Sequence, residues 1–232
     1  MEHQSLPKYV QISELLIRDI AAGRLMDGER LPPEREMAKS LGTSVGTLRK
    51  ALQELQGKGV LESVHGSGNY VRAQNDIASV YSLFRVELID GGGLPTAQVL
   101  SVDTLPKPTE WNNSHSGALA HRIRRLRCLN NVPAVVEEIW LDQAVCPKLT
   151  IADLSDALYM VYRKRLGLWI THAEDQLTLK QSPKWAPDDF GWPADVPTLC
   201  AIRTSWDQEN RPIEFSYNWI NTNVARYISR IK

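Results

Sequence analysis

The sequence predicts an α+β protein in which a small, mostly helical N-terminal part precedes a larger, strand-rich part. Apolar residues recur at helical spacing in the first part, whereas beyond residue 80 they form short alternating or continuous runs. A polar stretch, QNDIAS, lies between the two patterns. We therefore expect one domain at residues 1–74, a linker at 75–79 and a second domain at 80–232.

The first helix is predicted over residues 7–22, and Gly23 is its stop signal. One face of this helix is apolar and can cover the helices that follow it. The residues on that face are Tyr9, Val10, Ile12, Leu15, Leu16 and Ile20.

A helix-turn-helix is predicted within residues 31–57. Pro32 and Pro33 are tolerated in the first turn of its first helix. Gly42 stands where the left-handed backbone of a helix C-terminus favours glycine, and Thr43 or Ser44 can cap the next helix. The turn between the two helices is therefore expected to be short.

The second helix of this pair has a buried stripe and an exposed side with hydroxyl and cationic residues, which suit the phosphates and base edges of DNA. Two strands at 60–63 and 69–72 follow, joined by a glycine-rich tip whose backbone can lie close to a sugar-phosphate chain. Together they predict a winged helix-turn-helix. The stripe is Val45, Leu48, Ala51, Leu52 and Leu55, and the exposed side carries Ser44, Thr47, Arg49, Lys50 and Gln53.

This segment resembles the winged-helix domain of GntR-type bacterial transcription regulators. The resemblance implies that operator DNA is contacted by Arg35, Ser44, Thr47, Arg49 and the wing at His65 and Gly66. The matching residues are Leu31, Pro32, Glu34, Arg35, Ala38, Leu41, Gly42, Ser44, Thr47, Arg49, Ala51, Leu52, Leu55, Gly59, Gly66, Gly68 and Val71.

The resemblance departs from the family pattern at Val45, where the family usually has an arginine that reads guanine. More of the DNA reading is then expected to fall on Arg49 and Lys50. A plainer alternative is that Arg35 and Arg49 are helix-surface residues, that Lys50 forms an i,i+4 pair with Glu54, and that the wing histidine is merely solvated.

The chain has 27 basic and 27 acidic side chains and therefore no net charge, so the DNA-binding prediction rests on the placement of residues and not on bulk attraction. Cys128, Cys146 and Cys200 lack the spacing of a disulfide framework or a zinc site. No signal peptide or membrane-spanning run is recognisable. We expect a cytoplasmic protein that needs no metal or cofactor and does not enter a membrane.

The second domain is predicted to be built on an antiparallel sheet. A helix is expected at 151–164, near a cap at Thr150, and a weaker helix at 116–120. Strands are expected at 84–89, 97–102, 121–129, 134–141, 170–179, 198–206 and 213–220.

Four arginines crowd the strand predicted at 121–129: Arg122, Arg124, Arg125 and Arg127. Strand alternation places Arg125 and Arg127 on one face with Ile123 and Leu129, and the other two arginines on the opposite face. Two guanidiniums one residue apart on a partly aliphatic face can clamp a phosphate or a carboxylate. The alternative is that both are exposed, or paired with sheet carboxylates such as Glu137.

This half resembles the UTRA effector domain of the HutC-like branch of GntR regulators, a domain that looks like chorismate lyase in fold. The features that carry the resemblance include RLR at 125–127, NNVP at 130–133, WLD at 140–142 and RPIE at 211–214. The resemblance implies that Arg125 and Arg127 clamp the ligand, that Glu137 and Glu214 accept its hydrogen bonds, and that Tyr159 adds an aromatic wall and a hydroxyl. The stretch at 182–197 departs from the family and is expected to reshape the pocket.

The function expected from both halves is that of a homodimeric, DNA-binding transcription regulator, most simply a repressor, that senses a small anionic metabolite such as a phosphorylated sugar. Two half-sites about one helical turn apart, roughly 34 Å, require two reading heads. Two alternatives stay open. One is a regulator controlled by a partner or constitutively active, without a small-molecule ligand, and the other is an enzyme of chorismate-lyase-like fold.

Overall fold

The computed structural model describes residues 6–72, 83–111 and 117–230. The chain separates into two compact units, one comprising residues 6–84 with the C-terminal end and the other residues 85–228. The expected linker at 75–79 lies outside the described residues. Each unit has its own hydrophobic core, and the combination of a helical unit with a large antiparallel sheet confirms the α+β prediction.

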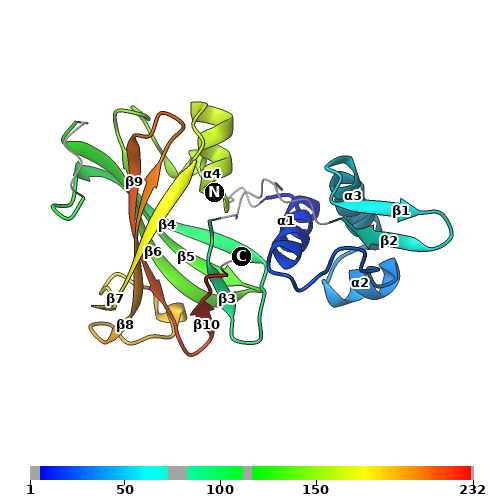
Figure 1. Cartoon of the computed structure of the whole chain (residues 1–232). Helices are drawn as coiled ribbons and strands as arrows, with labels where there is room; N and C mark the ends of the chain where they lie inside the picture. Colours follow the sequence, from blue (N-terminus) through cyan, green and yellow to red (C-terminus); the bar gives the residue numbers. More distant parts are fainter. Residues whose placement is uncertain (1–5, 73–82, 112–116, 231–232) are drawn as a thin grey trace. The chain divides into compact units, whose positions relative to one another are not determined.

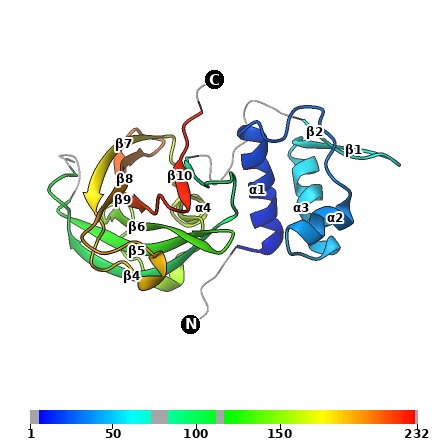
Figure 2. The ribbon, with the colours of Figure 1, turned by 90° about the horizontal axis from the view of Figure 1, so that it is seen from below.

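The first unit is a three-helix domain with a two-stranded wing (Figures 1 and 2). Helix α3 packs against both other helices, and one continuous core joins them to the base of the wing. The elements are α1 (Lys8–Ala21), α2 (Glu34–Ser40), α3 (Val45–Gly57), β1 (Leu61–Val64) and β2 (Gly68–Val71).

The turn between α2 and α3 forms as the local chemistry predicts. Gly42 has a φ of 57°, a left-handed conformation that glycine adopts without a steric penalty. The Ser44 side chain caps α3 by accepting a hydrogen bond of 3.1 Å from the Thr47 backbone N–H. The direction in which α3 leaves the turn is therefore set by these residues.

The second unit is built on one six-stranded antiparallel sheet, in the order β4-β5-β6-β9-β8-β7. A separate two-stranded pair joins β3 to β10. The strands are β3 (Val86–Leu88), β4 (Pro95–Pro106), β5 (Leu119–Leu129), β6 (Val132–Asp142), β7 (His172–Gln181), β8 (Pro197–Trp206), β9 (Pro212–Ile220) and β10 (Ala225–Tyr227). All seven predicted strands are present, and only β10 was not predicted, because three residues are too few to show a period.

The two faces of the large sheet are covered differently. On one, which we call the α4 face, Ile123, Ile139 and Leu141 pack with Leu158 and Tyr162 from the helical segment between β6 and β7. On the other, the tryptophan face, aromatic residues of the sheet pack with Trp111 and with Phe190 of the short 3₁₀ helix Asp188–Phe190. Strands β5, β6 and β9 are therefore buried on both sides, which explains their continuous apolar runs.

The predicted helix at 151–164 is interrupted. It consists of a 3₁₀ turn (Ile151–Asp153), helix α4 (Leu158–Val161) and a π-helical turn (Tyr162–Leu166). Thr150 caps the first turn together with Asp153, as predicted. The chain is extended at Leu154, and buried Asp156 accepts a hydrogen bond of 3.1 Å from the backbone of Ala97, which fixes the interruption to the sheet.

The weaker helix predicted at 116–120 is wrong in its described part, because Leu119 and Ala120 begin strand β5. Residue 116 lies outside the described residues. Pairing with β4 and β6 decides the conformation of this segment, since both neighbours offer backbone partners to it. Across the described residues, no helix is both long and apolar enough to span a membrane.

Candidate nucleic-acid interface and buried arginine site

The predicted DNA-contacting residues of the first unit lie at its surface. Arg35 of α2 is exposed, as are Ser44, Arg49 and Lys50 at the start of α3, whereas Thr47 is half-buried against the Ser44 cap. The opposite stripe of α3 is buried in the core of the unit. The amphipathic pattern of the helix therefore leaves a polar, cationic surface free to meet another molecule.

The cations on this surface are held only loosely. Arg49 Nε lies 2.7 Å from Glu34 Oε2, but the Arg49 side chain is 63% exposed, so the pair contributes at most about 1 kcal/mol. Lys50 Nζ lies 4.0 Å from the ring centroid of Tyr9. The alternative pair of Lys50 with Glu54 is not formed, because Glu54 binds Lys58 at 2.8 Å. Both cations can therefore exchange these partners for phosphate oxygens at little cost.

The wing presents its tip to solvent. His65 and Gly66 are exposed, and Gly66 has a φ of 72° that favours glycine at the bend. Ser67 and Tyr70 brace the hairpin with a hydroxyl–hydroxyl hydrogen bond of 2.6 Å. The tip is thus small, backbone-rich and held in one shape, as contact with a sugar-phosphate chain requires.

Arg125 and Arg127 lie on the α4 face of the sheet and share one carboxylate. Arg125 Nη2 is 2.6 Å from Glu137 Oε2, and Arg127 Nε is 2.8 Å from Glu137 Oε1. Arg125 stands directly across from Glu137 in the pairing of β5 with β6. All three residues are buried, with 3 to 4% exposure. The pairing with Glu137 that the sequence left as an alternative is therefore present.

This cluster concentrates charge in the interior: two guanidiniums share the Glu137 carboxylate, and Arg127 also reaches the backbone oxygen of buried Asp156 at 3.5 Å. Burial lowers the pKa of Arg125, and attraction to Glu137 only partly offsets this effect. Burial by itself would raise the pKa of Glu137, but the two arginines lower it below its ordinary value, so the carboxylate is charged. Nε and Nη1 of Arg125 have no hydrogen-bond partner within the described part of the chain.

A second polar cluster on the same face surrounds Glu214. Tyr159 Oη donates to Glu214 Oε1 at 2.9 Å, Tyr162 Oη donates to Oε2 at 2.8 Å, and Ser205 Oγ donates to Oε1 at 3.0 Å. Burial raises the pKa of Glu214 in spite of these three donors. Burial and the neighbouring carboxylate also raise the pKa of both tyrosines, so their hydroxyls stay protonated and donate.

Sequence reasoning found five residues of this face and missed others. Tyr162 was not predicted, although it is fully buried and its hydroxyl donates to Glu214 Oε2 at 2.8 Å. Arg203 is held by Asp175 at 2.6 Å on the same face. Two sequence patterns could have predicted these residues. Tyr159 and Tyr162 have the i,i+3 spacing of one helix face, and Arg203 and Ser205 have the i,i+2 spacing of one strand face. The remaining arginines, Arg122 and Arg124, point to the other face and pair with Asp103 and Glu138, as the alternation predicted.

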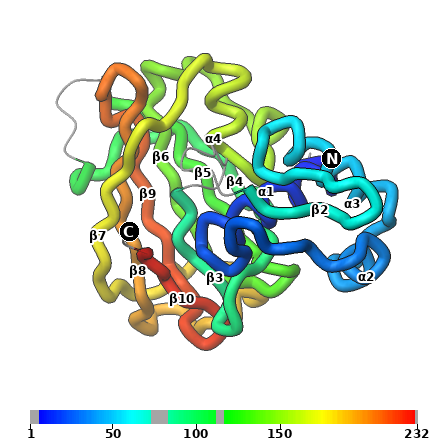
Figure 3. Tube along the Cα trace, turned by 45° about the vertical axis from the view of Figure 1, so that its right-hand side comes forward, coloured from blue at the N-terminus to red at the C-terminus, as the bar shows by residue number. Residues whose placement is uncertain are grey.

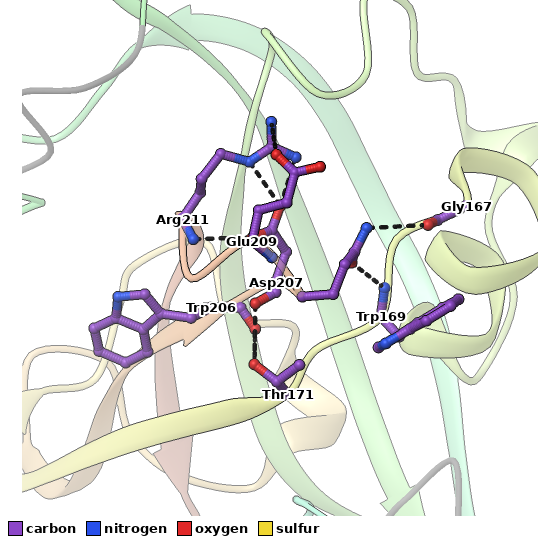
Figure 4. Close-up of polar contacts among 8 residues, drawn as sticks. Gly167, Trp169, Thr171, Trp206, Asp207, Glu209 and Arg211 are labelled. Atoms are coloured by element: carbon purple, nitrogen blue, oxygen red, sulfur yellow. Dashed lines mark hydrogen bonds and ion pairs between the residues drawn. The ribbon is translucent and has the colours of Figure 1, made fainter.

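The hairpin between β8 and β9 fixes the positions of Ser205 and Glu214, which stand opposite each other at its base. Figure 4 shows how its loop is tied together. The fully buried Asp207 accepts hydrogen bonds from the Arg211 guanidinium at 2.6 and 2.8 Å and from the backbone N–H of Glu209 and Arg211. Two contacts join this loop to residues 167–171. Gln208 bonds to the backbone of Gly167 and Trp169, and the Thr171 hydroxyl donates to the Asp207 backbone oxygen.

We expect Asp207→Asn to lower the Tm of the 85–228 unit by about 2 to 6 °C at pH 7, since charged hydrogen bonds are lost. Burial would raise the pKa of Asp207, but the Arg211 and backbone hydrogen bonds lower it below 3.8. A carboxyl with a depressed pKa stabilises the fold above its unfolded pKa, and this stabilisation disappears as the pH falls through its folded pKa. In melting curves from pH 7 to 3, the difference in Tm between the unchanged protein and Asp207→Asn should therefore become smaller below about pH 4. A difference independent of pH would contradict this role.

The two units define the class of protein. A winged helix-turn-helix with an exposed cationic helix, followed by a sheet domain with a buried polar site, is the arrangement of a DNA-binding transcription regulator. Residues 8–71 match the family of bacterial regulatory proteins called gntR, and residues 90–226 match the UTRA domain. The chain belongs to the GntR family of transcription regulators, in the branch that carries a UTRA domain.

The similar proteins agree with this assignment. The chain is 52% identical to the HTH-type transcriptional regulator SmoD of Agrobacterium fabrum over 98% of its own length and 97% of that protein. It is 25% identical to the mannosyl-D-glycerate transport/metabolism system repressor MngR of Escherichia coli, over 95% of this chain and 94% of the relative. It is 24% identical to the HTH-type transcriptional repressor NagR of Bacillus subtilis, over 97% and 96%. These proteins are named as regulators and not as enzymes.

Solved structures show the same fold. The possible transcriptional regulator YydK of Bacillus subtilis superposes with a TM-score of 0.55 at 20% identity, covering 98% of this chain and 100% of that one. PhnF of Mycobacterium smegmatis gives a TM-score of 0.52 at 18% identity, covering 94% and 98%. Within the described residues, no group of histidine, cysteine, aspartate and glutamate side chains is arranged to hold a metal ion.

Proposed function

We propose that this protein is a homodimeric, cytoplasmic repressor whose 85–228 unit binds a small anionic metabolite, such as a phosphorylated sugar, and thereby changes the occupancy of its operator. The observation that carries the proposal is the buried pair Arg125 and Arg127 on the single carboxylate of Glu137. The buried Arg125 guanidinium keeps Nε and Nη1 without a partner in the described part of the chain, and such N–H groups are costly to bury unless a further acceptor binds them. A phosphate or carboxylate group of a ligand would do so.

The rest of the α4 face suits the polar body of such a ligand. Glu214 and Glu137 offer carboxylate oxygens that can accept hydrogen bonds from ligand hydroxyl or amino groups, and Tyr159 adds an aromatic ring and a hydroxyl. Hydroxyl-rich molecules such as sugars present many donors of this kind. The similarity to MngR, the mannosyl-D-glycerate transport/metabolism system repressor, supports a carbohydrate-related metabolite and a repressing role.

For the operator we propose that α3 enters the major groove and that the wing lies along the backbone. The proposed contacts are Arg35, Ser44, Thr47, Arg49, Lys50, His65 and Gly66, all of which are exposed except the half-buried Thr47. Two copies of α3 would read half-sites about 34 Å apart. A ligand that favours one arrangement of the two reading heads by about 1 to 3 kcal/mol would change operator affinity 5- to 150-fold.

A thermal-shift experiment tests the ligand part of the proposal. Hexose 6-phosphates, the parent hexoses and inorganic phosphate are the probes. A bound ligand at 100 times its Kd adds about 2.7 kcal/mol, which raises the Tm by roughly 5 to 11 °C. Arg127→Lys should remove the shift, because an ammonium cannot bind an anion with two parallel N–H groups.

The matched control is Arg124→Lys on the tryptophan face, which should keep the shift. Stabilisation of the Arg127→Lys variant equal to that of the unchanged protein would contradict the arginine clamp. A flat response of the unchanged protein to all anionic metabolites would favour control by a partner protein or constitutive repression.

A further inference from the structure

The two edges of the large sheet differ in how they are protected. Edge strands expose unpaired backbone groups and usually carry prolines, bulges or charges that prevent pairing with another chain. Strand β4 begins and ends with proline and has a bulge between Val99 and Ser101. Strand β7 contains no proline and pairs with β8 in unbroken register from His172 to Gln181, so its protection is limited to the charges of Glu174, Asp175 and Lys180. Figure 3 shows β7, in yellow, at the outer edge of the sheet.

Strand β7 also exposes apolar side chains. Leu177 is 51% exposed and Leu179 is 72% exposed. Leu177 stands opposite Ala201, and Leu179 stands opposite Leu199. Both leucines therefore lie on the α4 face. Nothing in the described part of the chain pairs with the outer side of β7. A ten-residue edge in unbroken register with exposed leucines is suited to pairing with a further strand.

We infer that the outer edge of β7 pairs antiparallel with β7 of a second copy of this chain, with Leu177 on the two-fold axis. This inference specifies the interface of the homodimer in the proposed function. A two-fold contact uses the same surface on both copies, so the strand must be complementary to itself. The β7 sequence on either side of Leu177 is complementary to itself in charge.

Charge supports this register. Residues equally far from Leu177 along the strand stand opposite each other across the axis, so Glu174 faces the partner's Lys180, and the converse pair forms as well. Both side chains lie on the tryptophan face; Lys180 Nζ is 4.4 Å from the Tyr217 ring centroid and 4.0 Å from Glu110 Oε1, and Glu174 accepts a hydrogen bond of 2.9 Å from Gln176. Opposite charges directly across an antiparallel pair are stabilising, and like charges are destabilising. On the other face the two copies of Leu177 meet at the axis, and Leu179 stands opposite the partner's Asp175.

Sedimentation of the full chain without DNA tests the inference by charge reversal. Glu174→Lys and Lys180→Glu each place like charges opposite each other twice, and each should raise the dimer dissociation constant about tenfold. The double variant E174K/K180E restores opposite charges and should return the constant to within about threefold of the original. A double variant as weak as the single ones would overturn the register.

Leu177→Glu should prevent dimerisation at concentrations where the unchanged protein is fully dimeric, since it places two carboxylates at the axis. The matched control is Ile151→Glu, because Ile151 is 49% exposed on the same unit but far from β7 in the sequence. Circular dichroism checks that both variants are folded. Oxidation of Leu177→Cys gives a second measurement, because side chains opposite each other in such a pair are about 5 Å apart and should form a covalent dimer.

Two outcomes separate this inference from the proposed function. Dimerisation of Leu177→Glu like that of the unchanged protein, with operator binding intact, would overturn the β7 interface and leave the repressor proposal standing. Disruption by Leu177→Glu in a protein that binds no DNA fragment would confirm the interface and contradict the repressor proposal.

Discussion

Replacing Glu137 with alanine is expected to lower the free energy of unfolding of the 85–228 unit by about 3 to 5 kcal/mol, which is a fall in Tm of roughly 6 to 20 °C. The variant leaves Arg125 and Arg127 buried without their shared counter-charge. Urea unfolding followed by tryptophan fluorescence measures the loss. Inorganic phosphate at high concentration should restore more stability to this variant than to the unchanged protein, because an anion can replace the missing carboxylate.

The matched control for this prediction is the neighbouring residue on the opposite face. Glu138 binds Arg124 at 2.9 Å, but the Arg124 side chain is 23% exposed and reaches water. Glu138→Ala should therefore destabilise clearly less, and phosphate should not rescue it. An equal loss in both variants, or no selective rescue, would show that the buried charge of Arg125 and Arg127 is not the important feature of the site.

Arg49→Ala is expected to weaken operator binding by about 1 to 3 kcal/mol per half-site, which is about 5- to 150-fold for each. Its guanidinium is the largest exposed donor group on the front of α3, and the family's usual arginine is replaced by Val45. Fluorescence anisotropy with DNA selected from a random library by the unchanged protein measures the effect. Stability should change by less than about 1 kcal/mol, because the pair with Glu34 is exposed.

Two further variants make this experiment specific. Lys58→Ala removes a cation that follows the C-terminal end of α3, where it binds Glu54, and should leave operator affinity nearly unchanged. Glu34→Ala frees Arg49 from its tether and should preserve or improve the affinity. Operator binding by Arg49→Ala equal to that of the unchanged protein would remove Arg49 from the reading residues.

The first unit was predictable nearly to the residue because its determinants are local. Gly42 at the turn, the Ser44 cap and the apolar stripe of α3 act within a few positions of one another. Seven of the eight strands described in the second unit were predictable for the same reason, since a strand shows its period over its own length. The helix at 151–164 was not, because the hydrogen bond between Asp156 and Ala97 joins segments far apart in the chain.

By itself the sequence determined the order of the elements, the family, and the face of β5 on which Arg125 and Arg127 lie, because each of these follows from side-chain periods and local motifs. Only the tertiary structure decided that both arginines share Glu137, that Tyr159 and Tyr162 meet on Glu214, and that the leucines of β7 reach an open edge. These facts depend on strand order and on which strand is outermost, and a single strand's sequence does not specify its neighbours.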